Sequence, residues 1–353
     1  MHTPILSEYL KNESTINVSK TMKMKKRGVI FVVLLVLVLL LVASCAGGGR
    51  LRRSRSQAQP YNFHVGSQGV QMHFLQGNPP QRLYEGDPLT MILEYANKGA
   101  YDITDGRLYI SGYDREYVRL EAAENPLSTT FTAEGKDEFN PMGEITDVKE
   151  YKDPAVSMPP NVDIFRQVFK ATACYKYRTE ASPTVCIDPD PLSVDPEDKV
   201  CIVTPMSLGS QGAPVAVSSI EPEVARDRAQ FKINIANVGT GTVIESAQGR
   251  SPIERCHADL KRDEIDKVEI HAFISDTPLE CKPDIVRLTN GNGFSFCTLD
   301  LRTIQQREAY QTILNVYLDY GYRDSIATAV DILRLPGAGD DRLSPYYRPY
   351  RRD

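Results

Sequence analysis

Six cysteines beyond residue 56 are the side chains most capable of defined chemistry: Cys174, Cys186, Cys201, Cys256, Cys281 and Cys297. An even number of thiols in an exported chain predicts a disulfide framework. Cys281 and Cys297 flank an Asn-Gly turn, so their pairing would close a hairpin. Zinc is not expected, because no Cys-x-x-Cys occurs and the adjacent Cys256 and His257 alone supply too few ligands.

The other four cysteines allow two arrangements. In the first, Cys174 and Cys186 face one another across a turn, and Cys201 pairs with Cys256. In the second, Cys186 pairs with Cys201 and closes an acidic loop, which leaves Cys174 and Cys256. The sequence leaves both arrangements open, since spacing alone does not determine connectivity.

That acidic loop carries the densest group of carboxylates, which includes Asp188, Asp190, Asp195 and Asp198. Oxygen ligands from one loop could hold calcium. Their spacing does not match an EF-hand, however, and three prolines stiffen the loop. We therefore interpret it as a solvated loop between domains, with calcium as a weaker alternative and no other metal or cofactor expected.

Motifs for catalysis are missing from the sequence. It contains no Gly-x-Ser-x-Gly, no glycine-rich phosphate loop and no histidines at metal-binding spacing, so no catalytic residue is assigned and the chain is not expected to be an enzyme. Residues 56–353 hold 31 Lys and Arg against 44 Asp and Glu. This acidic balance argues against nucleic acid as a partner, because phosphate binding needs a positive surface.

A hydrophobic segment at residues 29–46 follows a basic region, residues 1–28. It has 18 residues without a charge, a length typical of a membrane-targeting segment. We therefore expect a cytoplasmic or cleaved n-region, a signal or anchor segment, and a basic tether at 47–68. The membrane becomes an expected partner, and the body is expected on the extracytoplasmic face.

The end of this segment, Leu41-Val42-Ala43-Ser44-Cys45, resembles the lipobox of prokaryotic lipoproteins. The resemblance implies that Cys45 is lipidated and becomes the new N-terminus. A transmembrane helix that is retained is the first alternative, since about 20 apolar residues span a bilayer. A pilin-like leader is the second, because Lys26-Arg27-Gly28 directly precedes the apolar run.

Two pairs of similar segments indicate a tandem duplication. Segments 89–99 and 231–239 alternate apolar and polar residues and end at Asn-x-Gly motifs 140 residues apart. Segments ending at 175–178 and 320–323 alternate into Tyr-x-Tyr-Arg motifs 145 residues apart. Alternation predicts strands, and many short strands with turns between them predict antiparallel sandwiches.

The duplication and the strand pattern predict a mainly β protein with two tandem antiparallel β-sandwiches after the N-terminal segment. The best helix candidate is short and covers residues 300–311, with Asp300 as N-cap. The expected parts of the body are a first domain at 69–205, a second at 206–337, and a mobile tail at 338–353.

The strands that end in Asn-x-Gly resemble those of CARDB-type domains, immunoglobulin-like modules of prokaryotic surface proteins. The resemblance implies seven-stranded, exported sandwiches that act as spacers or ligand-binding modules. The chain contains no Trp, so it lacks the core Trp of true immunoglobulin domains. No functional residue can be transferred, because that family has no fixed site.

These observations predict a membrane-anchored surface protein that serves adhesion, spacing or envelope assembly by non-catalytic binding. Its expected partner is an envelope protein or a glycan. The alternative is an exported enzyme or solute-binding protein with its site in residues 125–161, the longest stretch without a strand pattern. Long loops of that kind are often functional.

Overall fold

The computed structural model describes residues 62–121, 127–143, 145–190, 199–245, 252–303 and 308–335. All of them belong to one compact unit, Asn62–Asp353. The n-region, the hydrophobic segment with Cys45, most of the tether and the tail 338–353 lie outside the described residues, as do Asp195 and Asp198. In the described part of the chain, no helix is long and apolar enough to cross a membrane.

The described residues are mainly β, as predicted, and their helical elements are three short 3-10 turns: η2 (Pro252–Arg255), η3 (Arg262–Glu264) and η4 (Leu301–Thr303). The strands are β1 (Val70–Phe74), β2 (Arg82–Tyr84), β3 (Leu89–Asn97), β4 (Ile103–Ser111), β5 (Leu127–Ala133), β6 (Thr146–Asp153), β7 (Ile164–Ala181), β8 (Thr184–Ile187), β9 (Met206–Ser207), β10 (Val215–Val224), β11 (Arg228–Asn237), β12 (Thr242–Ile244), β13 (Lys267–Ile274), β14 (Thr277–Pro278), β15 (Glu280–Lys282), β16 (Ile285–Arg287), β17 (Asn292–Asp300) and β18 (Tyr310–Leu333).

These strands form three sheets. One has the order β1-β3-β6, and the second has the order β15-β17-β11-β10-β9. The third is ten-stranded: its path is β14-β13-β18-β7-β4-β5, and β2, β8, β12 and β16 pair alongside it.

Alternation of side chains explains why these segments form strands. In β11, Phe231, Ile233 and Ile235 are buried, while the residues between them are partly exposed. Successive strand side chains point to opposite faces, so one face enters the core. Full burial of each such side chain contributes about 2 kcal/mol. Met91 of β3 and Phe169 of β7 belong to the same core cluster as these β11 residues, so all three sheets share one core.

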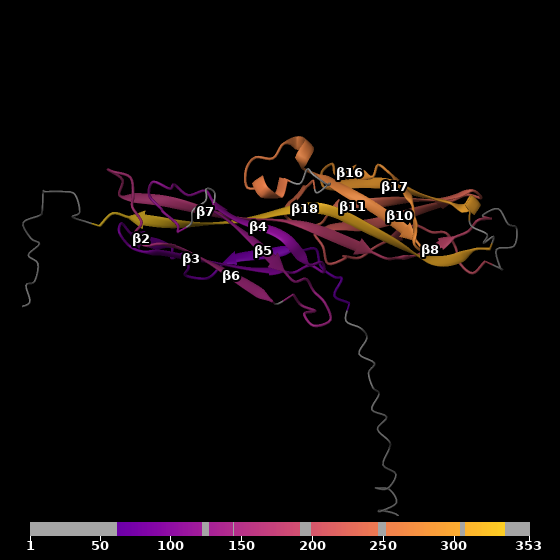
Figure 1. Ribbon diagram of the computed structural model, residues 1–353, viewed down its shortest axis with the longest axis horizontal. Helices are drawn as coiled ribbons and strands as arrows, with labels where there is room; N and C mark the ends of the chain where they lie inside the picture. The colour runs from indigo at the N-terminus through magenta and orange to yellow at the C-terminus, as the bar shows by residue number, and fades with distance from the viewer. Residues whose placement is uncertain are drawn as a thin grey trace, which may run out of the picture. The chain divides into compact units, whose positions relative to one another are not determined.

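The longest pairing joins β7 to β18. The two strands run antiparallel, and the ladder extends from Ala181 opposite Val316 to Ile164 opposite Leu333. At roughly 3.3 Å per residue, the 24 residues of β18 span about 80 Å. Figure 1 shows β18 extending from the region of β2 to that of β8, and both of these strands pair with it. The two halves of the body therefore share a sheet.

The register of this ladder agrees with an internal duplication. Tyr175 lies opposite Tyr322, and Tyr177 lies opposite Tyr320. The 145-residue offset relates Tyr175 to Tyr320 and Tyr177 to Tyr322. Applied to the pair Tyr175–Tyr322, it therefore gives the other facing pair, Tyr320–Tyr177. A ladder of that kind is self-complementary, as in a twofold interface. The local twofold axis passes between Lys176 and Gly321, which lie opposite one another and are themselves 145 residues apart.

All six cysteines are paired: Cys174 with Cys256, Cys186 with Cys201, and Cys281 with Cys297. The hairpin pair is the expected one, because β15 and β17 place its two cysteines directly opposite each other.

For the remaining four cysteines the structure has the second arrangement, and the first, with Cys174–Cys186 and Cys201–Cys256, is wrong. The reason is the path of β8. This strand does not return along β7 but pairs with β18, where Cys186 lies opposite Gln311.

Two further expectations are corrected. Residues 125–161 contain β5, which pairs with β4, and β6, which pairs with β3, so much of this stretch belongs to the sheets. The described residues of 300–311 do not form the expected helix: β17 continues to Asp300, a 3-10 turn follows, and β18 begins at Tyr310. Asp300 Oδ1 accepts a hydrogen bond from the Arg302 N–H, which forms a local turn instead of a helix cap. The division into immunoglobulin-like domains at 69–205 and 206–337 stays a prediction.

Candidate functional site

Four buried tyrosines surround the local twofold axis: Tyr175, Tyr177, Tyr320 and Tyr322. The ring centroids of the two pairs that face each other across the strands lie 6.1 and 6.2 Å apart. Burial raises the pKa of each hydroxyl above its ordinary value of 10.0. All four hydroxyls therefore stay neutral at physiological pH and serve as hydrogen-bonding groups.

In the first half, one hydroxyl holds the Asn-x-Gly turn after β3. The Tyr177 hydroxyl donates to Asn97 Oδ1 at 3.3 Å and accepts from the Tyr101 N–H at 3.2 Å. Asn97 Nδ2 donates to the Tyr101 carbonyl at 2.7 Å. A Cβ at Gly99 would overlap the Tyr177 hydroxyl, so the turn accepts only glycine there.

The same bonds recur in the second half. The Tyr322 hydroxyl donates to Asn237 Oδ1 at 3.0 Å and accepts from the Gly241 N–H at 2.8 Å. Asn237 Nδ2 donates to the Gly241 carbonyl at 3.0 Å, and a Cβ at Gly239 would overlap the Tyr322 hydroxyl. Asn97 and Asn237 thus make matching hydrogen bonds, which agrees with their expected equivalence. In each half, the Asn-x-Gly and Tyr-x-Tyr-Arg motifs thus contact each other through the same hydrogen bonds.

The symmetry breaks two residues beyond each Tyr-x-Tyr motif. In the first half, Thr179 Oγ1 donates to the Val215 carbonyl at 2.6 Å and lies 2.9 Å from the Tyr320 hydroxyl. The residue 145 positions later is Asp324. Its Oδ2 accepts from the Tyr175 hydroxyl at 3.1 Å, and that hydroxyl in turn accepts from the Val70 N–H at 3.0 Å.

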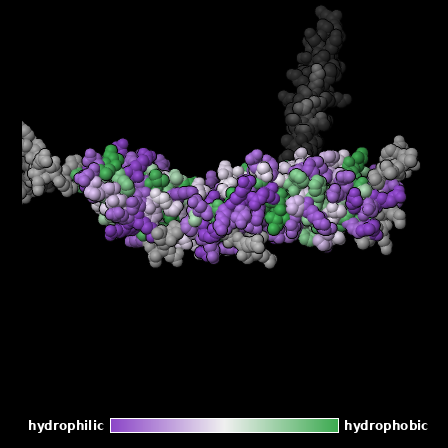
Figure 2. Space-filling view, turned by 90° about the horizontal axis from the view of Figure 1, so that it is seen from above, coloured by the Kyte–Doolittle hydropathy of each residue, from purple (hydrophilic) through white to green (hydrophobic). Residues whose placement is uncertain are grey.

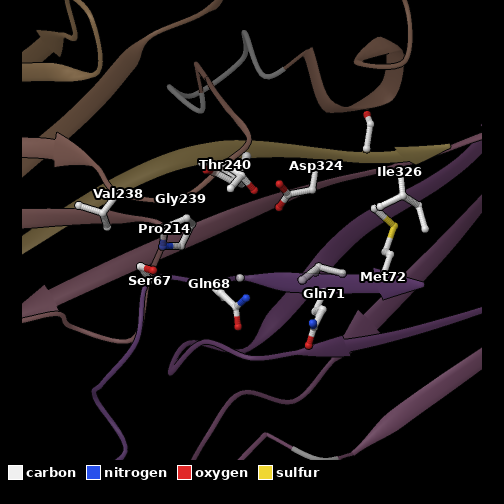
Figure 3. A pocket seen from close by; sticks show the side chains of 14 residues that line it. Ser67, Gln68, Gln71, Met72, Pro214, Val238, Gly239, Thr240, Asp324 and Ile326 are labelled. Carbon is white, nitrogen blue, oxygen red and sulfur yellow. The ribbon is translucent and has the colours of Figure 1, made fainter.

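A cavity of about 240 Å³ lies beside Asp324. It is formed by the start of β1, by the turn between β11 and β12, and by β18. Figure 3 shows Thr240 next to Asp324, Met72 next to Ile326, and Gln68 on the opposite side. Asp324 is the only charged side chain among the 14 residues that line the cavity.

Burial raises the pKa of Asp324 from 3.8 to about 6, although the hydrogen bond from Tyr175 opposes the rise. Folding therefore favours the protonated acid. The stability that the protonated Asp324 contributes is fully present below about pH 4 and is lost as the pH rises through 6. A rise of this size corresponds to about 3 kcal/mol of stability that the ionised form lacks. At neutral pH the cavity thus contains a carboxylate that destabilises the fold.

The described part of the acidic loop does not have the arrangement of a calcium site, which was the weaker alternative. Asp188 Oδ2 lies 2.6 Å from Lys199 Nζ, which also donates to the Asp190 carbonyl at 2.9 Å. The Asp190 carboxylate lies 3.8 Å from an Arg226 nitrogen. Cations of the chain thus neutralise the two described carboxylates, and the described residues contain no group of three or more potential metal ligands. Calcium binding to the complete loop stays a prediction.

Sequence reasoning missed Asp324, although the pattern contained a signal for it. Leu318, Tyr320 and Tyr322 share the inward face of β18, and Asp324 is the next residue in the same alternation. A carboxylate at an inward position departs from the pattern and marks a special environment. Comparisons with protein-family models and with curated proteins find no match to this chain.

Proposed function

We propose that the protein is anchored in the membrane and projects a rigid β-body outside the cytoplasm for spacing, adhesion or envelope assembly, without catalysis. The ladder between β7 and β18 carries this proposal, because one continuous sheet joins both halves of the body. A spacer requires such a connection, since two domains on a flexible linker would bend where they meet. The disulfide between Cys174 and Cys256 also joins the two halves.

The disulfides support an extracytoplasmic location. Every cysteine in the described part of the chain is oxidised, and disulfides persist in oxidising compartments. The lipobox-like segment ending at Cys45 supplies the proposed anchor. A diacylated cysteine provides two chains, which is enough for stable attachment. Retention of residues 29–46 as a transmembrane helix would give the same orientation.

The outer face of the five-stranded sheet supports the binding part of the proposal. Phe294 and Phe296 are 48% and 37% exposed on β17. A hollow beside them is lined by Asn234 and Arg287, among others. Aromatic rings next to polar groups suit a glycan or a protein surface. On the face shown in Figure 2, hydrophobic residues are scattered among hydrophilic ones.

The enzyme alternative has less support. Fifteen of the described residues of 125–161 lie in β5 and β6, which have 7 and 8 residues, and the shallow hollow beside them is lined by Asp105 and Asp147 among others. Asp105 is already paired with Lys176 at 2.7 Å. A solute-binding role finds better support at the Asp324 cavity.

Liposomes that carry the full-length protein should co-sediment with isolated cell envelopes of the source organism in a saturable manner. Bare liposomes should not, because the proposed contact lies on the β-body. A panel of ester, peptide and glycoside substrates should show no turnover. Equal sedimentation of loaded and bare liposomes would contradict adhesion, and turnover of any substrate would favour the enzyme alternative.

Cys45→Ser should block acylation and cleavage of the leader, because the cysteine sulfur accepts the lipid and the peptidase recognises the modified residue. The variant should therefore be larger than the mature wild-type protein by the mass of residues 1–44 and lack the lipid. Intact-mass measurement of both proteins extracted from membranes checks this. A wild-type mass that includes residues 1–44 without lipid would instead establish the retained helix.

A further inference from the structure

We propose that the cavity beside Asp324 is a binding site for a primary alkylammonium group, supplied by a free amine or by a lysine side chain. The proposal does not depend on the adhesive role, because a small amine could enter this cavity whether or not the body contacts other envelope components.

The negative charge of Asp324 favours a cation as the ligand of this cavity. Asp324 is half-buried, and no Lys, Arg or His in the described part of the chain forms an ion pair with it. Its hydrogen-bond donor is the neutral hydroxyl of Tyr175, on Oδ2. A buried carboxylate without a charged partner is costly, and perturbed groups of this kind gather at functional sites. A bound cation would remove that cost.

The local symmetry shows that the fold does not require a carboxylate here. At the equivalent position, Thr179 bonds to the Val215 carbonyl within the chain. The Ala100 N–H, at the position equivalent to Thr240, donates to the Gly212 carbonyl at 2.7 Å. In the second half, Thr240 and Asp324 line an open cavity instead. The second half thus has the carboxylate of Asp324 at the position where the first half has the hydroxyl of Thr179, which hydrogen-bonds within the chain.

The shape and lining of the cavity favour an alkyl chain that ends in an ammonium group. A volume of about 240 Å³ exceeds the roughly 30 Å³ of one water severalfold. Val70, Met72 and Ile326 supply apolar contacts for methylene groups. Thr240, which Figure 3 shows next to Asp324, supplies a hydroxyl oxygen for an ammonium proton that Asp324 does not accept.

Other cations fit less well. A guanidinium group binds best when both carboxylate oxygens are free to accept from it, but Oδ2 of Asp324 already accepts from Tyr175. Calcium takes about six to eight oxygen ligands, and the cavity offers one carboxylate. An ammonium needs an anionic oxygen and a neutral acceptor beside it, and Asp324 and Thr240 supply them.

The test uses the full-length protein in detergent micelles with 13C-methyl-labelled methionines. The Met72 methyl lines the cavity, whereas Met91 lies in the core and serves as an internal reference. Addition of n-butylamine at pH 7.5 should shift the Met72 signal in a saturable manner and leave Met91 in place. n-Butanol should produce no such shift, since it has the same chain without the charge. A lysine-containing tripeptide and its norleucine analogue then distinguish a peptide-borne lysine from a free amine.

Two carboxylate variants distinguish a specific role of Asp324 in binding from a general effect of removing a negative charge. Asp324→Asn should weaken butylamine binding at least tenfold, whereas Asp276→Asn, which removes an exposed carboxylate elsewhere, should leave it unchanged. Thr240→Trp at the exposed rim should also block entry. If Asp324→Asn does not fold, the comparison of n-butylamine with n-butanol on the wild-type protein still decides the proposal.

Binding should weaken at pH 5, where Asp324 is largely protonated. The titratable groups that face it are Tyr175 from β7 and Tyr322 from β18, and both remain neutral between pH 5 and 8. β1 and the Thr240 turn contribute neutral lining residues. Equal shifts with n-butylamine and n-butanol, equal binding by Asp324→Asn, or a Met72 shift that calcium alone reproduces would each overturn the proposal.

Discussion

Removal of the disulfide between Cys174 and Cys256 should lower the free energy of unfolding by about 4.5 kcal/mol. The two residues are 82 positions apart, so the bond closes a long loop and restricts the unfolded chain strongly. It also ties β7 to the segment after η2, where both cysteines are fully buried. Denaturant unfolding of Cys174→Ala/Cys256→Ala against the wild-type protein measures the loss.

The Cys186–Cys201 pair provides the control, because its residues are only 15 positions apart. The same relation gives about 3 kcal/mol for Cys186→Ala/Cys201→Ala. The longer loop should therefore show the larger loss when the other two disulfides are intact. The reverse order would mean that strain or residual structure outweighs loop length.

Asn97→Ala should cost about 3–4 kcal/mol of stability, since it leaves several buried polar groups without partners. Asn97 is only 1% exposed. Its Nδ2 donates to the carbonyls of Tyr101 and Ala133, and its Oδ1 accepts from the Gly99 N–H and the Tyr177 hydroxyl. The Gly99 N–H and the Tyr177 hydroxyl would lose a partner in the buried interior, and the two carbonyls would lose one in a partly buried position. Thermal and urea unfolding of the variant measure the cost.

The duplicated residue is the matched control for this prediction. Asn237 is partly exposed, and its side chain bonds to the Gly241 carbonyl and the Tyr322 hydroxyl. We expect about half the loss for Asn237→Ala, because fewer groups lose a partner and water can reach the site. The loss of stability in the double variant Tyr177→Phe/Asn97→Ala should be smaller than the sum of the two single losses, since both substitutions remove the same hydrogen bond. Equal losses at the two asparagines would contradict the argument from burial.

Local patterns in the sequence predicted local features of the fold. The alternation in β11, for example, depends only on which side chains face the core, and it predicted the strand correctly. The Asn-Gly turn between Cys281 and Cys297 predicted their disulfide, because a hairpin brings nearby residues together. The two pairs of motifs predicted equivalent positions, since each copy repeats the same short-range bonds. The helix expected at 300–311 failed because a single cap residue is a weak signal beside strand pairing.

By itself, the sequence determined the mainly β character, the hairpin disulfide and the two equivalent Asn–Tyr pairs, all of which follow from side-chain alternation or repeated motifs. Only the tertiary structure decided that Cys174 pairs with Cys256 and that Asp324 borders a cavity. These features depend on the register of β7 against β18 and on the partner of β8. Such pairings join residues more than 100 positions apart, and their stability comes from the packed core as a whole, which no local pattern encodes.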